Sequence, residues 1–402
     1  MKKFNPAFIL GMFETGLAVG RSLGRNGIKV YGFDTKRDIG FFSHYINAKI
    51  CPDPNTNENE AEFINFLLEQ AASFKLKPVL FITSDNFLLP VAKNLKKLEK
   101  HLIINLPGFN LLSRISNKFE QYKLAKEAGI DVPETVLIED KKDIEEVIDS
   151  LIFPVFIKGM ESNEWRKVFG GSKKGYVYKN SGDLKKDSEK LLSKNIILIA
   201  QELIKGPDTN HYKFCGYVSE EKELTAGFCL RKLRQNPVHY GVGSLVESIE
   251  YPGLMETGKK FFKAINYYGV GSAEFKLDER DGKLKLIELN PRYWQQNSVA
   301  EACGINFPLI QYRDLTDQPV EKIFQYKTGI KWVNIYSDFD SYLSYRKEKT
   351  LSFKEWLKSL KGKKVFSDWA KDDIKPGFYE IRFGKRLFNL PAYFIKRLKR
   401  NG

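Results

Sequence analysis

The sequence predicts an α/β domain at the N-terminus and an α+β region after it. Residues 7–34 read as strand, helix and strand, because apolar runs flank a segment with helical periodicity. Further apolar runs at 153–159 and 196–208 read as strands, and residues 211–237 read as two antiparallel strands. Residues 269–292 contain two β-rich runs around a polar turn. A helix-connected start followed by consecutive strands indicates this order of fold classes.

The composition indicates a globular protein of two or three domains. The chain has 402 residues, of which 42% are hydrophobic and 13% aromatic, and no apolar run reaches the ~18 residues of a membrane span. The formal charge of +15 favours anionic partners, but much of it lies near the C-terminus. We expect the N-terminal run to be a first strand and not a signal peptide. The dispersed cysteines indicate reduced thiols in a cytoplasmic protein.

The N-terminal βαβ pattern is typical of a Rossmann-like lobe. Its first strand is AFILG (7–11), its helix spans 14–26, and its second strand ends at Asp34. The glycines here do not form Gly-x-Gly-x-x-Gly, so nicotinamide binding is weakly indicated and a structural lobe is the preferred interpretation. A further strand (78–86) has Thr83-Ser84-Asp85 at its carboxyl end, where these residues could touch a substrate or cap a helix.

Two lysines stand out in the middle of the chain. Lys118 precedes a helical pattern that Gly129 ends, and by itself it reads as a surface lysine near a helix cap. Lys158 ends the apolar strand 153–159, where an unpaired lysine is unusual and indicates an anionic partner. The glycine-rich turn 169–175 could wrap phosphates or be an ordinary hairpin turn.

A basic cluster follows in the antiparallel strands. Arg231, Arg234 and His239 could hold a carboxylate or an acyl phosphate, and the alternative is a solvated run of charges. The functional interpretation is preferred for Arg231, whereas His239 is more simply structural.

The polar turn at Glu279-Arg280-Asp281-Gly282 predicts a hairpin. If its loop is Arg280 to Gly282, Glu274 faces Glu288 across the ladder. Alternation then places Glu274 and Glu288 on a polar face together with Lys276, Asp278, Asn290 and Arg292, and the core face carries Ala273, Phe275, Leu277, Ile287 and Leu289. Leu284 and Leu286 also fall on the polar face, so that face is not simply solvent-exposed.

The facing carboxylates predict a divalent cation between them. Two acids about 5 Å apart repel each other, and Mg²⁺ would relieve this through hard oxygen ligands shared with substrate phosphates. Asn290 adds a third oxygen, and Arg292 adds a planar cation suited to phosphate. The alternative is a solvated hairpin whose polar face is acidic.

The run SAEF…LIELNPR resembles the metal-binding hairpin of the ATP-grasp superfamily. The resemblance covers roughly residues 5–320. It implies that Glu274, Glu288 and Asn290 bind Mg²⁺ (or Mn²⁺) on ATP phosphates and that Arg292 stabilises the transferred phosphoryl group. Lys118 and Lys158 would reach the nucleotide phosphates, and the turn 169–175 would be a flexible lid.

The same resemblance places the adenine hinge at Gln201-Glu202-Leu203-Ile204. In the family, the backbone of this hinge bonds the adenine edge. A downstream acid binds the ribose hydroxyls. Asp208 would supply that acid here, although the family's position could equally fall at Thr209.

The resemblance also implies the domain layout. We expect a Rossmann-like pre-ATP-grasp domain at 1–112 and then a two-lobed ATP-grasp fold. Its small lobe would span 113–200 and its C-terminal lobe, with the metal site, 201–325. A basic extension would span 326–402.

The predicted activity is ADP-forming ligation of a carboxylate to an amine, or to a thiol, through an acyl phosphate. The substrates, besides ATP, would be small or glycan-linked carboxylates and amines, and we expect no nucleic acid. Arg292 and Arg231 would act at the reacting groups. The alternatives are a dinucleotide-dependent oxidoreductase, which gives ELNPR no role, and a non-catalytic basic binding protein, which leaves the acidic pair idle.

The C-terminal end, FNLPAYFIKRLKRNG, reads as a short basic helix with apolar residues. It could contact an anionic membrane or a polyanion. Packing onto the body of the protein, with a solvated basic edge, is the preferred interpretation.

Overall fold

The computed structural model describes residues 4–55, 59–160, 165, 168–169 and 175–383. Most of the glycine-rich turn, at 170–174, and the basic end, at 384–402, therefore lie outside the described residues. The chain divides into two units. The first unit comprises Met1–Leu106, Arg292–Tyr336 and Leu357–Gly402, and the second comprises Pro107–Pro291 and Ser337–Trp356. The predicted boundaries at residues 112, 200 and 325 stay predictions.

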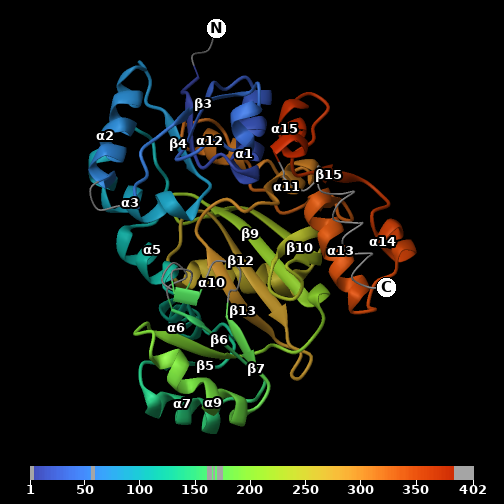
Figure 1. The fold of residues 1–402 in the computed structure, drawn as a ribbon. Helices are drawn as coiled ribbons and strands as arrows, with labels where there is room; N and C mark the ends of the chain where they lie inside the picture. The colour runs from blue at the N-terminus through green and yellow to red at the C-terminus, as the bar shows by residue number, and fades with distance from the viewer. Residues whose placement is uncertain (1–3, 56–58, 161–164, 166–167, 170–174, 384–402) are drawn as a thin grey trace. The chain divides into compact units, whose positions relative to one another are not determined.

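A four-stranded parallel sheet forms the centre of the first unit (Figure 1). Its order is β3 (Ile46–Ile50), β2 (Val30–Asp34), β1 (Ala7–Leu10), β4 (Val79–Ile82). All four residues of the inner strand β1 are buried, as expected within a parallel sheet, and all four residues of β4, at the end of the order, are buried as well. The predicted strand–helix–strand start is confirmed, with α1 (Glu14–Arg25) as its helix.

Further helices and strands complete the first unit. They are η1 (Ile39–Phe42), α2 (Asn59–Ala72), η2 (Asp85–Phe87), α3 (Leu88–Lys93), α4 (Leu95–Leu98), α11 (Asn297–Cys303), α12 (Phe307–Asp314), β14 (Lys331–Val333), β15 (Lys364–Phe366) and α15 (Lys375–Phe383). The chain crosses from the first unit to the second within α13 (Ile335–Lys347), and it crosses back within α14 (Phe353–Ser359). No helix among the described residues is long and apolar enough to cross a membrane.

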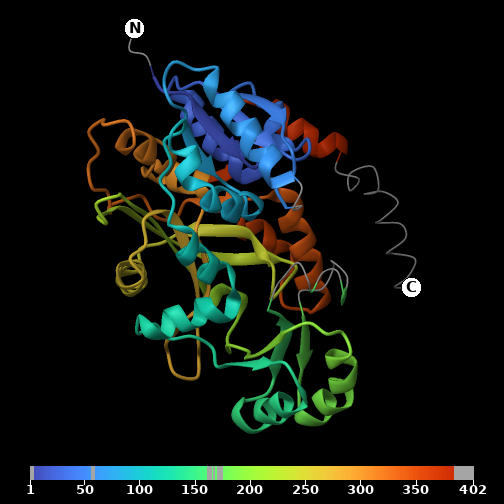
Figure 2. The same cartoon turned by 90° about the vertical axis from the view of Figure 1, so that its left-hand side faces the viewer.

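The second unit contains a small antiparallel sheet. Its order is β5 (Thr135–Ile138), β8 (Leu198–Glu202), β6 (Val155–Gly159), β7 (Tyr176–Tyr178). The helices α7 (Lys141–Ser150) and α9 (Ser181–Leu192) lie together against this sheet (Figure 2) and share one apolar core with it. An Asp140–Asp143 capping box begins α7.

A larger antiparallel sheet carries the predicted hairpin. Neighbouring strands follow the order β13 (Leu284–Asn290), β12 (Gly269–Leu277), β9 (His211–Val218), β10 (Leu224–Asn236), β11 (Val242–Ser248). Apolar side chains of α6 (Lys118–Glu127) and α10 (Pro252–Ala264) pack in one core with Phe214, Phe275 and Leu289. α5 (Phe109–Ser116) precedes α6, and η3 (Asp208–Asn210) precedes β9. The opposite face carries polar side chains such as Lys213 beside buried apolar ones such as Phe228 and Leu230.

The hairpin is confirmed, but its loop differs from the predicted one. The Asp278 amide donates to the Lys283 carbonyl at 2.9 Å, so the loop comprises Glu279 to Gly282, and Gly282 has a φ of +70°. From this turn the register runs Leu277↔Leu284, Lys276↔Lys285 and Phe275↔Leu286.

A β-bulge at Ile287 then brings Glu274 opposite Glu288. The bulge also corrects the predicted faces of β13. Leu286 lies in the core with Phe275, whereas Ile287, which was predicted to be core, is only partly buried. A regular hairpin would place Leu284 and Leu286 on the polar face. Because β13 has one extra residue, both leucines pack with the core while Glu288 still faces Glu274.

Candidate active site

Glu274 faces Glu288 across the β12–β13 ladder, on the polar side of the larger sheet. Its two carboxylate oxygens accept from Lys213 Nζ at 2.9 Å and from Lys232 Nζ at 2.8 Å. Lys213 lies directly opposite Glu274 on β9, and Lys232 lies on β10. Burial raises the pKa of Glu274, but the two ammonium groups outweigh it and hold this pKa well below its usual range. The carboxylate is therefore charged at neutral pH.

Glu288 forms an ion pair with Lys118, the first residue of α6. Asn117 caps this helix, since its side-chain oxygen accepts from the Phe119 and Glu120 amides. Gln121 then ties α6 to β13 by exchanging hydrogen bonds with the Leu289 carbonyl and amide, at 3.0 and 2.9 Å. This packing fixes Lys118 beside the hairpin.

Asn290 lies two residues beyond Glu288 on β13. Its Nδ2 donates to Glu288 Oε2 at 3.3 Å. The three predicted metal ligands are therefore brought together at one end of the hairpin.

Lys158 reaches the same part of the second unit from β6. Its ammonium lies 3.3 Å from Gln201 Oε1 and 5.7 Å from the centre of the Tyr122 ring. The Tyr122 hydroxyl donates to the Ile287 carbonyl at 2.9 Å, next to Glu288. The predicted phosphate ligands Lys118 and Lys158 are thus both tied to the acidic hairpin, one directly and one through Tyr122.

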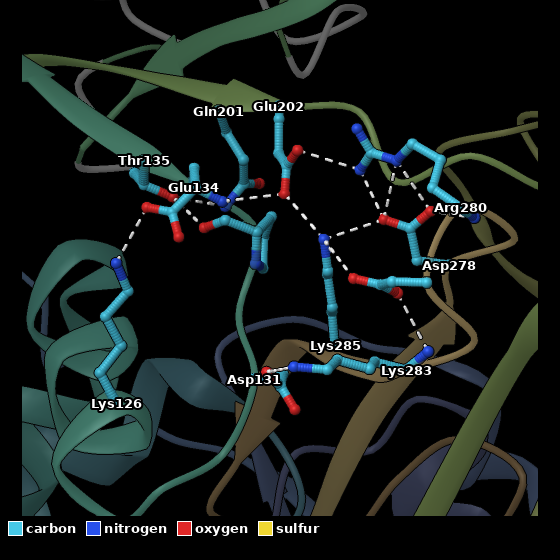
Figure 3. A network of polar contacts seen from close by, with 12 residues as sticks. Lys126, Asp131, Glu134, Thr135, Gln201, Glu202, Asp278, Arg280, Lys283 and Lys285 are labelled. Carbon is cyan, nitrogen blue, oxygen red and sulfur yellow. Dashed lines mark hydrogen bonds and ion pairs between the residues drawn. The ribbon is translucent and has the colours of Figure 1, made fainter. Parts of the chain in front are cut away.

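The predicted hinge begins at the end of β8, where the side chain of Glu202 joins a charged network (Figure 3). The Glu202 carboxylate accepts from Lys285 Nζ at 3.0 Å, from Arg280 Nη2 at 2.9 Å and from the Glu134 amide at 3.1 Å. Asp278 shares Arg280 and Lys285, and its hydrogen bonds from Arg280 lower the pKa of Asp278 despite burial. The network holds the hairpin turn against the hinge.

The backbone of the hinge is partly engaged within the protein. The Glu202 amide donates to the Glu134 carbonyl at 3.0 Å and the Leu203 amide to the Pro154 carbonyl at 3.3 Å. Ile204 is buried and Leu203 half-buried, which suits an apolar wall. Gln201 is fixed by Thr135, whose hydroxyl lies 3.1 Å from Gln201 Nε2.

Asp208 lies at the start of η3, four residues past the hinge. Its carboxylate accepts from the His239 amide at 2.9 Å and from the Tyr345 hydroxyl. Burial raises the pKa of Asp208, but these hydrogen bonds outweigh it and the pKa is lowered.

Arg231, one of the two predicted catalytic arginines, lies on the other face of the larger sheet from Glu274. Arg231 shares a register row with Tyr212, and Tyr212 with Phe275, so it occupies the face opposite Glu274. Its Nε is buried without a partner among the described residues. Arg234, in the same basic cluster, instead pairs with Asp338.

Arg292 belongs to the first unit. Its guanidinium makes a bidentate pair with Asp85, at 2.6 and 2.7 Å, and donates to the Tyr293 carbonyl. Asp85 thus binds Arg292, while Ser84 precedes η2 without a side-chain capping bond.

Sequence reasoning missed Lys213 and Lys232, which bind Glu274. The available signal was the one that singled out Lys158, a lysine within an apolar strand, since Lys213 stands in HYKFCGYV and Lys232 in CLRKL. Tyr345 was missed as well, and it carries no local signal because it lies 137 residues from Asp208.

The donor set suits a cation that arrives with an anionic ligand. Among the described residues no group of three or more His, Cys, Asp or Glu side chains could hold a metal ion. Two carboxylates and one carboxamide match Mg²⁺, which commonly combines one or two carboxylates with substrate phosphates. The lysines that bind Glu274 and Glu288, together with Lys158, supply positive charge for such phosphates.

Two stretches of the chain match known family models. One lies within the second unit, and the other begins there and extends into the first unit. Residues 115–211 match the RimK-like ATP-grasp domain, and residues 233–313 match the carbamoyl-phosphate synthase L chain, ATP binding domain. A curated relative, D-aspartate ligase of Enterococcus faecium (strain Aus0004), is 23% identical over 278 residues, which are 66% of this chain. The match spans 65% of the length of that ligase.

Solved structures show the same fold. N5-carboxyaminoimidazole synthetase from Staphylococcus aureus complexed with ADP has a TM-score of 0.63, with 17% identity and 81% of each chain covered. The biotin carboxylase domain of Hydrogenobacter thermophilus 2-oxoglutarate carboxylase, solved with MgADP, has a TM-score of 0.59. That match has 15% identity and covers 79% of this chain and 71% of the other.

Proposed function

Because the chain belongs to the ATP-grasp superfamily, we propose that it is an ATP-dependent, ADP-forming carboxylate–amine ligase. The observation that supports this most is the facing pair Glu274 and Glu288 with lysines on both acids. Enzymes of this superfamily use ATP with Mg²⁺, and the donor set of the hairpin fits that pair. No observation favours the oxidoreductase or the non-catalytic alternative.

The proposed reaction has two steps. A substrate carboxylate oxygen attacks the γ-phosphorus of ATP, the bond to ADP breaks, and an acyl phosphate forms. An amine nitrogen then attacks the acyl carbon, phosphate leaves with the bonding electrons, and the nitrogen loses a proton. Both steps depend mainly on positioning and charge neutralisation.

Residues of the second unit would perform distinct tasks in the first step. Mg²⁺, when bound through Glu274, Glu288 and Asn290, would neutralise charge on the phosphates. Lys118 and Lys158 would bind phosphate oxygens, for which each would exchange a contact that it makes within the protein. Gln201 to Ile204, with Asp208 beyond them, would form the adenosine side. The roles of Arg231 and Arg292 at the reacting groups stay predictions from the resemblance.

The relative's name supports an amino acid as one substrate of this chain. D-Aspartate ligase is similar to this chain over 278 residues, and that similarity favours a carboxylate or amine of the amino-acid class. A glycan-linked acceptor and a peripheral contact of the C-terminal end with anionic membrane remain proposals from the sequence alone. A cytoplasmic location is proposed on the four cysteines, all buried and free.

The substitution Glu288→Ala tests the assignment. We expect it to abolish ATP-dependent ADP release because it removes one of the two facing carboxylates, while the thermal midpoint stays near that of the wild type. Glu256→Ala is the matched control, since Glu256 is exposed on α10 and pairs with Lys259 on the same helix. A coupled ADP assay and scanning fluorimetry measure both. Unchanged ADP release by Glu288→Ala would contradict the proposed function.

A further inference from the structure

The chain between Ser337 and Trp356 belongs to the second unit, although it follows the last residue of either family match. Most of this stretch is α13, which Figure 1 shows beside β10. Asn236 donates to the Ser337 hydroxyl, and further polar contacts with the rest of the unit come from positions 338, 341, 345 and 348, whose spacing places these four on one helical face. One side of α13, continued by one residue past its end, is therefore built to dock on the nucleotide-binding unit.

The first half of this face is a buried anchor. Asp338 is fully buried and accepts from Arg234 Nε and Nη2, both at 2.8 Å, and from Trp356 Nε1 at 2.8 Å. Ser341 bonds the Ser244 hydroxyl at 2.9 Å and the Gln235 carbonyl at 3.0 Å. These bonds fix α13 on β10 and β11.

The second half of the face reaches the adenosine side of the candidate site. The Tyr345 hydroxyl donates to Asp208, whose carboxylate also accepts from the His239 amide. The side chain of His239 contacts Glu348 as well, since its Nε2 lies 3.2 Å from the Glu348 carboxylate. Tyr345 and Glu348 thus hold Asp208 and the turn between β10 and β11.

That turn contacts β6, the strand that carries Lys158. The Tyr240 ring stacks on Phe156 of β6, with ring centres 5.4 Å apart and planes at 9°. Phe156 and Lys158 are two residues apart on β6 and share a face of the small sheet. A continuous series of contacts therefore leads from α13 through His239 and Tyr240 to the small sheet.

We propose that Tyr345 and Glu348 are positioning residues for nucleotide binding, acting through Asp208 and the His239–Tyr240 turn. The inference rests on the proposed function, in which Asp208 is on the ribose side of the site. A carboxylate held by a tyrosine hydroxyl and a backbone amide is already oriented when the nucleotide arrives, so binding loses less entropy in ordering it. Without these contacts Asp208 and the His239–Tyr240 turn would still be present, but their orientation toward the nucleotide would be less well fixed.

Tyr345→Phe removes one hydroxyl from this arrangement and keeps the ring. We expect it to weaken MgATP binding about 5- to 50-fold, as couplings of this kind do, and to raise KM for ATP with kcat unchanged. Tyr342→Phe is the matched control on the same helix, because the Tyr342 hydroxyl is buried without a partner among the described residues. Calorimetry with a non-hydrolysable ATP analogue and Mg²⁺ measures affinity independently of the acceptor. Equal affinities of Tyr345→Phe and wild type would overturn the inference.

A double-mutant cycle separates positioning from a general structural effect. If Tyr345 acts through Asp208, Tyr345→Phe should cause no further loss of affinity in an Asp208→Ala background. Additive losses would overturn the proposed route. Should Tyr345→Phe fail to fold, Glu348→Gln provides a second test at a more exposed position, again with weaker binding expected and unchanged affinity counting against the inference.

The outcomes also distinguish this inference from the ligase assignment. A wild-type chain that binds the analogue but releases no ADP with any acceptor would contradict the ligase proposal, and the binding comparison would still decide the role of Tyr345. A wild-type chain that binds no adenine nucleotide would overturn both.

Discussion

His211 is the most strongly perturbed imidazole of the second unit. It lies on β9 opposite Lys276, and both ring nitrogens are buried without partners among the described residues. Burial, followed by repulsion from Lys232 and Lys276, lowers the pKa of His211 to about 3. The imidazole is therefore neutral at neutral pH, on a face that it shares with Lys276 and Lys232.

The neutral His211 makes stability depend on pH. In the unfolded chain its pKa returns to about 6.5, so between pH 6.5 and 3 the unfolded state binds the proton that the native state excludes. Stability is thus present above pH 6.5 and is lost as the pH falls, by about 2 kcal/mol between pH 7.5 and 5. His211→Gln should remove this part of the loss, as read from urea unfolding at the two pH values.

The exposed His101 provides the control for this measurement. His101→Gln should leave the pH dependence as in the wild type. If His211→Gln shows the same fall in stability as the wild type, the buried neutral imidazole is not its source.

The residues of the candidate site differ in how far sequence could reveal them. The facing of Glu274 and Glu288, and the lysines 118 and 158, could be predicted because a hairpin and a family motif place them. Lys213 and Lys232 could not be assigned to Glu274, since pairing across three strands depends on the register of the whole sheet. Chemistry within one hairpin is local, whereas its partners come from other strands.

Among the elements, the hairpin β12–β13 shows how a turn and a bulge together set the register. The loop of four residues shifts the ladder by one relative to the predicted three-residue loop, and the bulge at Ile287 shifts it back. A turn motif indicates that a hairpin exists but does not fix its loop length. Leu284 and Leu286 were the sequence signal for this irregularity, because a regular ladder would have turned both side chains toward the polar face.

The hairpin turn depends on the backbone conformation of Gly282. Its φ is +70°, and a Cβ added there would meet nothing within 4 Å, so only backbone strain opposes a side chain. Gly282→Ala should destabilise the protein by about 1 kcal/mol. The measurement is the midpoint of thermal unfolding.

Gly253 is the matched glycine for that test. It lies in the first turn of α10 without a positive φ, and an added Cβ would make an ordinary contact with the Tyr251 ring at 3.4 Å. Gly253→Ala should raise stability by roughly 0.5–1 kcal/mol. Equal effects of the two substitutions would show that φ at Gly282 is not the constraint.

At the scale of the whole molecule, the first unit is assembled from three separate stretches of chain. Its parallel sheet could be predicted, because strand and helix periodicity are local and a βαβ order restricts the topology. The return of the C-terminal stretch to α1 could not, because the pair that fixes it, Arg21 and Asp373, is separated by 352 positions. Neither residue differs in its local sequence from an ordinary surface charge.

Two adjacent aspartates on this stretch allow the contribution of burial to be measured. Asp373 is fully buried and accepts from Arg21 Nε at 2.9 Å and from the Ser43 hydroxyl at 2.6 Å. Asp372 pairs with Arg25 at 2.7 Å, but both side chains remain partly exposed. Asp373→Asn should destabilise the first unit by about 3–5 kcal/mol, because it leaves the buried Arg21 charge uncompensated. Asp372→Asn should cost at most about 1 kcal/mol, since water screens that pair.

Hydrogen exchange locates the effect as well as its size. With Asp373→Asn, amide exchange should rise in α1, η1 and the stretch around residues 366–379, while the strands β9, β10 and β12 of the second unit keep their protection. Asp372→Asn should leave all of these regions protected. Equal destabilisation by the two variants would contradict burial as the cause, and a loss of protection that extended to β9 and β12 would show that the two units unfold together.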